Sequence, residues 1–191
     1  MDHERRRADL IDVVWQLIVD DGLPGVTIRR VAERSGWSSG AVRHYLPTRE
    51  AMVDAAAAQV GDVIEQRVRA VSTGADPREA LVGVLAAVLP DDDRMRQASR
   101  VWLAFVGQAA SDRALAERQG IVYRDLNDLL VQLLDWASTE GAQVVGGSTA
   151  AAAQLQALVD GLTAHVLLGQ VDVERARQVL QQAVDAVLGA D

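Results

Sequence analysis

The sequence predicts an all-α fold with about nine helices. Through most of its 191 residues, apolar side chains recur at intervals of three and four, the spacing of one helix face. No segment shows the sustained alternation of apolar and polar residues that is typical of a half-buried strand. Capping residues, glycines and prolines divide this pattern into segments of helical length. Hydrophobic residues make up 49% of the chain, which is enough to form a core.

Three helices are expected in the first fifty residues. The first runs over 4–21 and ends at the Asp-Asp-Gly-Leu-Pro-Gly segment over 20–25. Thr27 is a good N-cap for the second, and Gly36 closes that helix in the left-handed conformation that glycine tolerates. A third, short helix begins with Ser38 or Ser39 as its cap and ends near Leu46.

The remaining helices are bounded by equally local signals. Thr48 caps a fourth helix, and Asp76 followed by Pro77 starts a fifth that ends near residue 90. Further helices are expected over 92–110 and 111–140, and a glycine-containing loop over 141–148 separates them from the last two. These last helices span 149–168 and 173–188, and Asp172 caps the second of them.

Charge is distributed unevenly along the chain. The net charge is −8, but residues 1–50 contain eight Arg and eight Asp or Glu, so residues 51–191 contain the whole excess. A neutral N-terminal segment followed by an acidic remainder is expected of a protein that binds an anionic partner only through its N-terminal end. The absence of cysteine excludes disulfides, thiolate metal sites and Cys nucleophiles. With no membrane-spanning apolar run and no signal peptide at the N-terminus, we expect a cytoplasmic protein that does not engage a membrane.

The first three predicted helices have lengths of about 18, 8 and 7 residues, and a glycine turn joins the second to the third. This arrangement is typical of a helix-turn-helix, although a generic helical bundle shares the same spacing. If the former holds, residues 1–50 are a DNA-binding domain whose third helix enters the major groove.

The segment over residues 26–53, VTIRRVAERSGWSSGAVRHYLPTREAMV, resembles the N-terminal signature of the tetracycline-repressor (TetR) family. The resemblance covers residues 8–55. It departs from the family pattern at Arg43, where most relatives have tyrosine, and at Leu46, where they have phenylalanine. The resemblance implies a DNA-binding regulator in which residues 51–191 sense a ligand and form the dimer.

Arg43 is expected to read a base edge, with guanine as the preferred partner, because a guanidinium pairs both guanine acceptors. A contact with phosphate is the alternative. Tyr45 either holds a phosphate, as in the family, or packs against Leu17. Arg30 and Arg34 are interpreted as solvated charges, as is the arginine run over 5–7, for which an arm over the DNA backbone is the alternative. The full expected DNA-contacting set is Thr27, Arg29, Ser38, Ser39, Gly40, Arg43, His44, Tyr45, Thr48 and Arg49.

The last two helices carry wide apolar stripes, which favour dimerisation, although packing within one chain is the alternative. The resemblance implies a four-helix bundle with the symmetry mate, and hence a homodimer on a pseudo-palindromic operator in double-stranded DNA. The stripes comprise Leu155, Leu158, Val159, Leu162 and Val166 on one helix, and Val179, Leu180, Ala183, Val184 and Val187 on the other.

The stretches WLAFV (102–106) and LVDGL (158–162) resemble the C-terminal domain of relatives of the betaine-pathway repressor. The resemblance implies a cavity for a small-molecule effector. Aromatic and polar side chains suit such a cavity, although each could equally belong to the core. The candidate ligand-binding residues are Trp102, Phe105, Gln108, Tyr123, Trp136 and His165.

Catalysis is not expected, because the three histidines have no metal-binding spacing and neither a nucleophile elbow nor a phosphate-binding loop is present. We therefore predict no catalytic residue, metal or cofactor. The preferred function is a repressor released by its ligand. The alternatives are an activator of the same architecture and a helical interaction protein that does not bind DNA.

Overall fold

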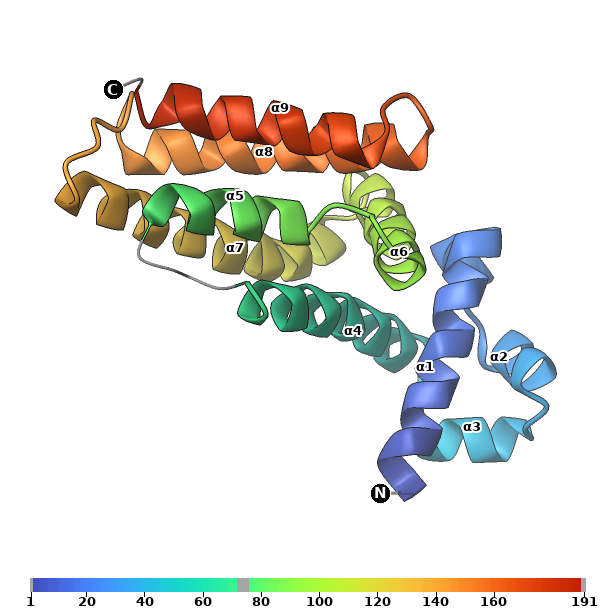
Figure 1. Cartoon of the computed structure of the whole chain (residues 1–191). Coiled ribbons are helices and arrows are strands. Elements are labelled where there is room, and N and C mark those ends of the chain that lie inside the picture. The colour runs from blue at the N-terminus through green and yellow to red at the C-terminus, as the bar shows by residue number, and fades with distance from the viewer. Residues whose placement is uncertain (1, 72–75, 190–191) are drawn as a thin grey trace. The chain divides into compact units, whose positions relative to one another are not determined.

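The computed structural model describes residues 2–71 and 76–189, and within these residues it contains helices and no strand (Figure 1). The all-α prediction is therefore confirmed. The helices are α1 (Asp2–Asp21), α2 (Ile28–Ser35), α3 (Ser39–Tyr45), α4 (Arg49–Arg69), α5 (Pro77–Ala87), α6 (Asp93–Ala109), α7 (Arg113–Thr139), α8 (Ser148–Leu167) and α9 (Val173–Val187), with a short 3₁₀ turn, η1 (Leu23–Gly25). No helix in the described part of the chain is long and apolar enough to cross a bilayer.

The helices begin where the capping residues predicted. Thr27 Oγ1 accepts a hydrogen bond from the backbone N–H of Arg30 at 3.2 Å, and Ser38 Oγ accepts one from Ala41 at 3.1 Å. Ser38, rather than Ser39, is therefore the cap of α3. Thr48, Asp76 and Asp172 cap α4, α5 and α9 in the same way. These bonds satisfy backbone donors that have no partner within the helix.

Contacts within the chain divide it into two compact units. Unit 1 contains residues 1–63 and 97–117, and unit 2 contains residues 64–96 and 118–191. Helices α4, α6 and α7 each contribute residues to both units. The expected functional division, with DNA binding in 1–50 and sensing in 51–191, is a different partition of the chain and stays a prediction.

The core of unit 1 is centred on α1. Trp15 is fully buried, and its indole Nε1 donates a hydrogen bond to the backbone carbonyl of Ala56 in α4 at 3.0 Å. This bond satisfies the only polar atom of a large buried side chain. The surrounding apolar residues, all buried, are Leu10, Val14, Leu17, Ile18, Val31, Val42, Leu46 and Met52. They hold α2 and α3 in place beside α1.

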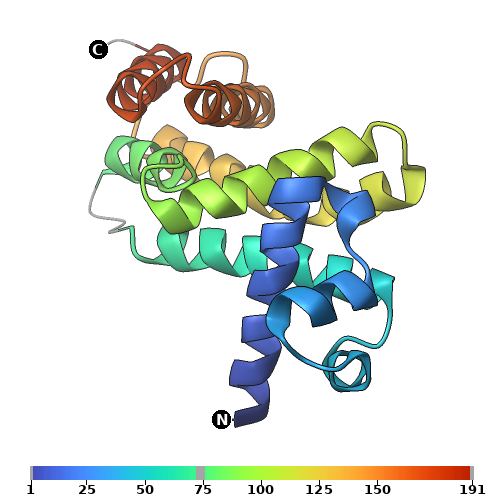
Figure 2. The same cartoon turned by 90° about the vertical axis from the view of Figure 1, so that its right-hand side faces the viewer.

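Unit 2 is built on α5, α8 and α9, which pack against one another (Figure 2). Its buried residues include Leu81, Leu85, Leu155, Val159, Leu180 and Val184. Ion pairs add to the packing at its edges. Arg78 of α5 pairs with Asp185 of α9, and Arg177 of α9 lies 2.6 Å from Asp91 in the turn between α5 and α6.

Candidate nucleic-acid interface

The turn between α2 and α3 depends on Gly36, which adopts φ 73° and ψ 13°. This left-handed conformation is costly for any residue with a Cβ atom, so glycine is the residue best suited to the position. The backbone N–H of Trp37 then donates to Ser35 Oγ at 3.3 Å. The chain therefore reverses within three residues and enters α3 at Ser38, as a helix-turn-helix requires.

Helix α3 buries one side and exposes the other. Val42 and the adjoining Leu46 are buried in the core of unit 1. Gly40, Arg43 and His44 are exposed on the opposite side, and Ser39 is half-buried at the start of the helix. No carboxylate of the described residues pairs with Arg43. Its guanidinium is thus available to an external acceptor, as direct base reading needs.

Aromatic contacts surround the C-terminal end of α3. The ring centroid of Tyr45 lies 5.5 Å from that of Trp37 and 5.0 Å from that of His44, and both pairs meet edge to face. Tyr45 is half-buried, so its ring packs in this group while part of the side chain reaches solvent. Both roles expected of Tyr45 remain compatible with this position.

Two arginines expected to be solvated also form ion pairs with α1. Arg30 Nη2 lies 2.6 Å from Asp21 Oδ2, and Arg34 Nη1 lies 2.5 Å from Asp20 Oδ2. These pairs connect α2 to the last turn of α1. Both arginines still reach solvent, so the ion pairs are compatible with their interpretation as solvated charges, although composition alone did not identify the partners.

The other residues expected to contact DNA differ in their surroundings. Arg29 is exposed and lies 3.6 Å from Glu33 on the next turn of α2. Arg49 donates through Nη2 to the backbone carbonyl of Leu23 at 2.8 Å, which ties the start of α4 to η1. Thr27, Ser38 and Thr48 accept backbone hydrogen bonds through their hydroxyl oxygens, so their hydroxyl hydrogens remain free to donate.

The expected ligand-binding residues do not come together in one unit. Trp102, Phe105 and Gln108 lie on α6 within unit 1, whereas Tyr123, Trp136 and His165 belong to unit 2. Tyr123 and Trp136 are thirteen residues apart on α7, which corresponds to about 20 Å along a helix. Phe105 is buried in the core and His165 is exposed. Of this set, only Tyr123 belongs to a polar cluster.

That cluster connects α7 with α8 and includes a residue that the sequence analysis did not select. Gln156 is 8% exposed, accepts a hydrogen bond from Asn127 Nδ2 at 2.9 Å and donates to the backbone carbonyl of Tyr123 at 3.0 Å. One helical turn later, burial raises the pKa of Asp160 to about 6, and a hydrogen bond with the Tyr123 side chain acts in the opposite direction. No basic side chain of the described residues forms an ion pair with Asp160.

The expected dimer residues fall into two groups. Leu155, Val159, Leu162, Leu180, Val184 and Val187 are buried within the single chain. They are core residues of unit 2, so the alternative of packing within one chain applies to them. Leu158, Val166, Val179 and Ala183 are only half-buried. The exposed side of α8 instead presents small residues four positions apart, namely Ala153, Ala157 and Gly161.

Comparisons with known proteins show which family this chain resembles. Residues 77–189 match the family model described as BetI-type transcriptional repressor, C-terminal. The chain is 32% identical over 192 residues to the HTH-type transcriptional regulator BetI of Burkholderia cenocepacia, covering 98% of this chain and 96% of that regulator. The chain belongs to the TetR family of transcriptional regulators.

Solved structures of other regulators share the fold of this TetR-family regulator. A transcriptional regulator from Rhodococcus sp. Rha1 superposes with a TM-score of 0.82 at 27% identity, over 95% of each chain. A regulator from Saccharomonospora viridis, solved in complex with choline, shares the fold with a TM-score of 0.83 at 23% identity, over 95% of this chain and 96% of that one. The protein is thus a helix-turn-helix DNA-binding regulator of a family that is not enzymatic, and the prediction of a non-catalytic regulator is confirmed.

Proposed function

We propose that this TetR-family regulator acts in the cytoplasm as a homodimeric repressor that binds a pseudo-palindromic operator and leaves it when a small molecule binds. The observation that supports operator reading is the exposed face of α3, where Arg43 has no carboxylate partner among the described residues and Gly40 allows close approach to the DNA. Arg43 reads a guanine, and His44, Tyr45, Thr27, Ser38 and Thr48 contact phosphates.

Selection of bound duplexes from a random DNA pool tests this function. Two recognition helices in a symmetric dimer read half-sites about 34–36 Å apart, so an inverted repeat with that spacing should be enriched. Affinity for the selected operator should fall steeply as salt rises, because phosphate contacts release counterions. No enrichment at low salt would favour the helical interaction protein. A reporter gene behind the operator then separates repression from activation.

A second copy of this chain is the proposed occupant of the exposed side of α8. Ala153, Ala157 and Gly161 leave little side chain between helices, and a Cβ atom at Gly161 would meet nothing within 4 Å in the single chain. Leu168, at the end of the same face, is 66% exposed. Small residues let two helices approach closely, and a symmetric dimer requires a self-complementary patch of this kind.

A small cation is the proposed effector, with Asp160 as the group that recognises its charge. Choline, the molecule held by the Saccharomonospora viridis regulator, is such a cation. In this chain Asp160 is a partly buried carboxylate that forms a hydrogen bond with the Tyr123 side chain, and burial disfavours its charged form. A bound cation would offset that cost, and the Tyr123 ring supplies an aromatic face that attracts cations.

Calorimetric titration with choline and with its neutral carbon analogue, 3,3-dimethyl-1-butanol, tests this site. Charge recognition predicts that choline binds and the analogue binds at least tenfold more weakly. Asp160→Asn should remove that preference. Equal binding of both molecules by the unmodified protein, or unchanged choline affinity in the variant, would refute the assignment. Addition of choline to the operator complex then shows whether this ligand releases the DNA.

A further inference from the structure

The first turn of α1 packs against the far end of the recognition helix. The imidazole of His3 lies 4.5 Å from the ring of Tyr45, centroid to centroid, and 5.8 Å from the ring of His44. Both α1 and α3 belong to unit 1, and the N-terminal end of α1 lies beside α3 in Figure 1. A residue near the start of the chain therefore contacts two of the residues to which we assign phosphate contacts.

His3, Trp37, His44 and Tyr45 together form a four-ring cluster. Its members come from α1, from the residue before the cap of α3, and from the last two residues of α3. Adjacent rings meet at centroid distances of 4.5–5.8 Å, within the range of favourable aromatic pairs. His3 and His44 are exposed, whereas Trp37 and Tyr45 are half-buried. The cluster thus lies at the surface, where contacts between the rings orient side chains that do not pack in the core.

We propose that His3 is a positioning residue for operator binding, which holds Tyr45 and His44 in the orientation that meets the DNA backbone. This inference rests on the proposed function, in which those two residues contact phosphates. A side chain that is already ordered loses less rotamer freedom when it binds, so pre-organisation raises affinity without any new contact. His3 restricts both rings at once, from a helix that is anchored by the core of unit 1.

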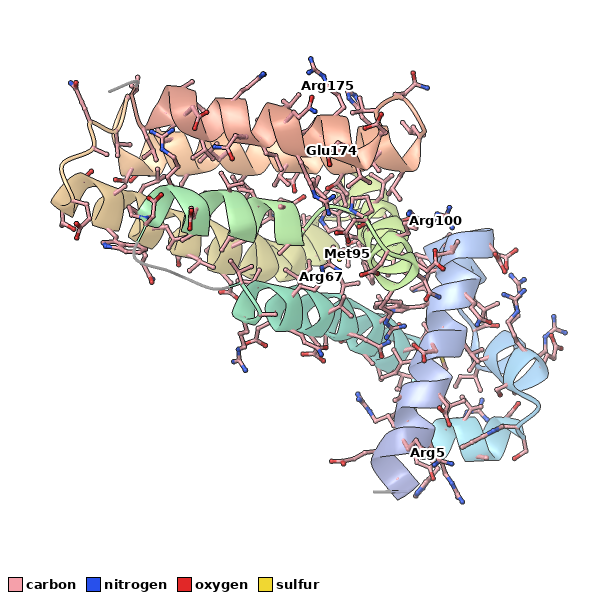
Figure 3. The ribbon with its side chains drawn as sticks, in the orientation of Figure 1. Arg5, Arg67, Met95, Arg100, Glu174 and Arg175 are labelled. Atoms are coloured by element: carbon pink, nitrogen blue, oxygen red, sulfur yellow. The ribbon has the colours of Figure 1, made fainter. Side chains whose placement is uncertain are left out.

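The first turns of α1 also carry basic residues, and Arg5 lies at that end of the helix in Figure 3. A direct phosphate contact by His3 is therefore the rival explanation for any effect of its removal. The two explanations differ in salt dependence. Loss of a phosphate contact by a charged side chain lowers the slope of log affinity against log salt by about one, and loss of an uncharged contact weakens His3→Phe as much as His3→Ala, whereas loss of positioning does neither.

The test compares His3→Ala, His3→Phe and the control Gln16→Ala in the full-length protein, bound to the selected operator. Gln16 is exposed and uncharged on the same helix. We expect His3→Ala to bind about three- to tenfold more weakly, the scale of one or two aromatic contacts, with an unchanged salt slope. His3→Phe keeps a ring and should bind within twofold of the unmodified protein, as should Gln16→Ala.

Three results would overturn the inference: unchanged affinity in His3→Ala, equal weakening in the Phe and Ala variants, or a reduced salt slope. The unmodified protein is measured first. If it selects no operator, the proposed function fails, whereas normal operator binding that is indifferent to His3 refutes only the positioning role. Because His3 is exposed, neither substitution removes a core contact, and circular dichroism verifies that each variant is folded.

Discussion

The guanidinium of Arg67, a residue labelled in Figure 3, lies 2.6 Å from the carboxylate of Asp91 and joins the last turns of α4 to the turn between α5 and α6. The same side chain pairs with Asp92 and donates through Nε to the carbonyl of Ala87 at 2.7 Å. Asp91 in turn accepts from Arg177 of α9. One partly buried arginine thus links three segments of unit 2.

Arg67→Ala should therefore destabilise the protein. Hydrogen bonds to charged groups are more valuable than neutral ones, but partial exposure reduces the effect, so we expect a loss of about 1–2 kcal/mol in the free energy of unfolding. Urea denaturation at fixed protein concentration measures it. Arg69→Ala is the matched control, because the pair of Arg69 with Glu65 on the same helix is exposed and should contribute less than about 0.5 kcal/mol. Equal effects of the two substitutions would contradict the structural role of Arg67.

Arg43→Ala should weaken operator binding and relax discrimination at one base pair of each half-site. A bidentate arginine–guanine contact corresponds to about 1–3 kcal/mol of discrimination. The measurement is the affinity of both proteins for the operator and for duplexes in which each base pair is changed in turn. A uniform loss on every duplex would assign Arg43 to phosphate instead.

Asp160 should make stability depend on pH. Its pKa is raised in the folded chain from 3.8 to about 6, so folding disfavours the ionised carboxylate. Below about pH 4 the group is protonated in both states and the penalty is absent. Between about pH 4 and 6 the carboxyl group ionises in the unfolded chain but stays protonated in the folded chain, so the free energy of unfolding falls as pH rises. Above about pH 6 both states are ionised and the full penalty applies. Asp160→Asn should therefore be more stable than the unmodified protein at pH 8, by about 1–2 kcal/mol after allowance for partial exposure, and the difference should vanish towards pH 4.

The same variant separates structure from function. A carboxylate that lowers the stability of the empty protein and yet is needed for cation binding behaves as a ligand-recognition group. Thermal unfolding between pH 4 and 8, beside the choline titration, provides both readouts. A variant that is less stable at every pH would assign Asp160 to the packing of α7 against α8.

Ala157→Glu should dissociate the dimer without unfolding the chain. Ala157 is exposed on α8, so a glutamate there meets solvent in the monomer but a like charge across a symmetric contact. Sedimentation velocity measures the change in mass. Ala70→Glu, at another exposed alanine of unit 2, is the control and should remain dimeric. A dimer that survives Ala157→Glu would move the interface away from this side of α8.

Local chemistry made most of the fold predictable. Thr27, Gly36 and Asp76 mark helix ends through bonds and conformations that involve only a few neighbouring residues, so the sequence alone identified them. The apolar stripes on α8 and α9 identified buried faces but not the covering partner, because periodicity is the same for a core within one chain and for an interface. Six of the ten stripe residues are accordingly buried inside unit 2.

The site was less predictable where contacts are distant in sequence. His3 meets Tyr45 only because α1 returns beside α3, and no spacing rule connects them. Asp160 lies within the LVDGL stretch, whose resemblance assigned no role to the carboxylate, and its environment emerges only when Tyr123 is brought next to it. His165 and Trp136 were chosen for their chemistry, but helix geometry separates them from this cluster.

The edge-to-face contact of Trp37 with Tyr45 also places a fluorescent side chain beside the proposed DNA-reading surface. Tryptophan emission responds to the polarity around the indole and to nearby rings, and Trp37 is half-buried in the four-ring cluster beside the recognition helix. The other three tryptophans, Trp15, Trp102 and Trp136, are not members of this cluster, so comparison with Trp37→Phe isolates the emission that comes from it. We therefore expect the Trp37 emission of the unlabelled protein to change when it binds the selected operator.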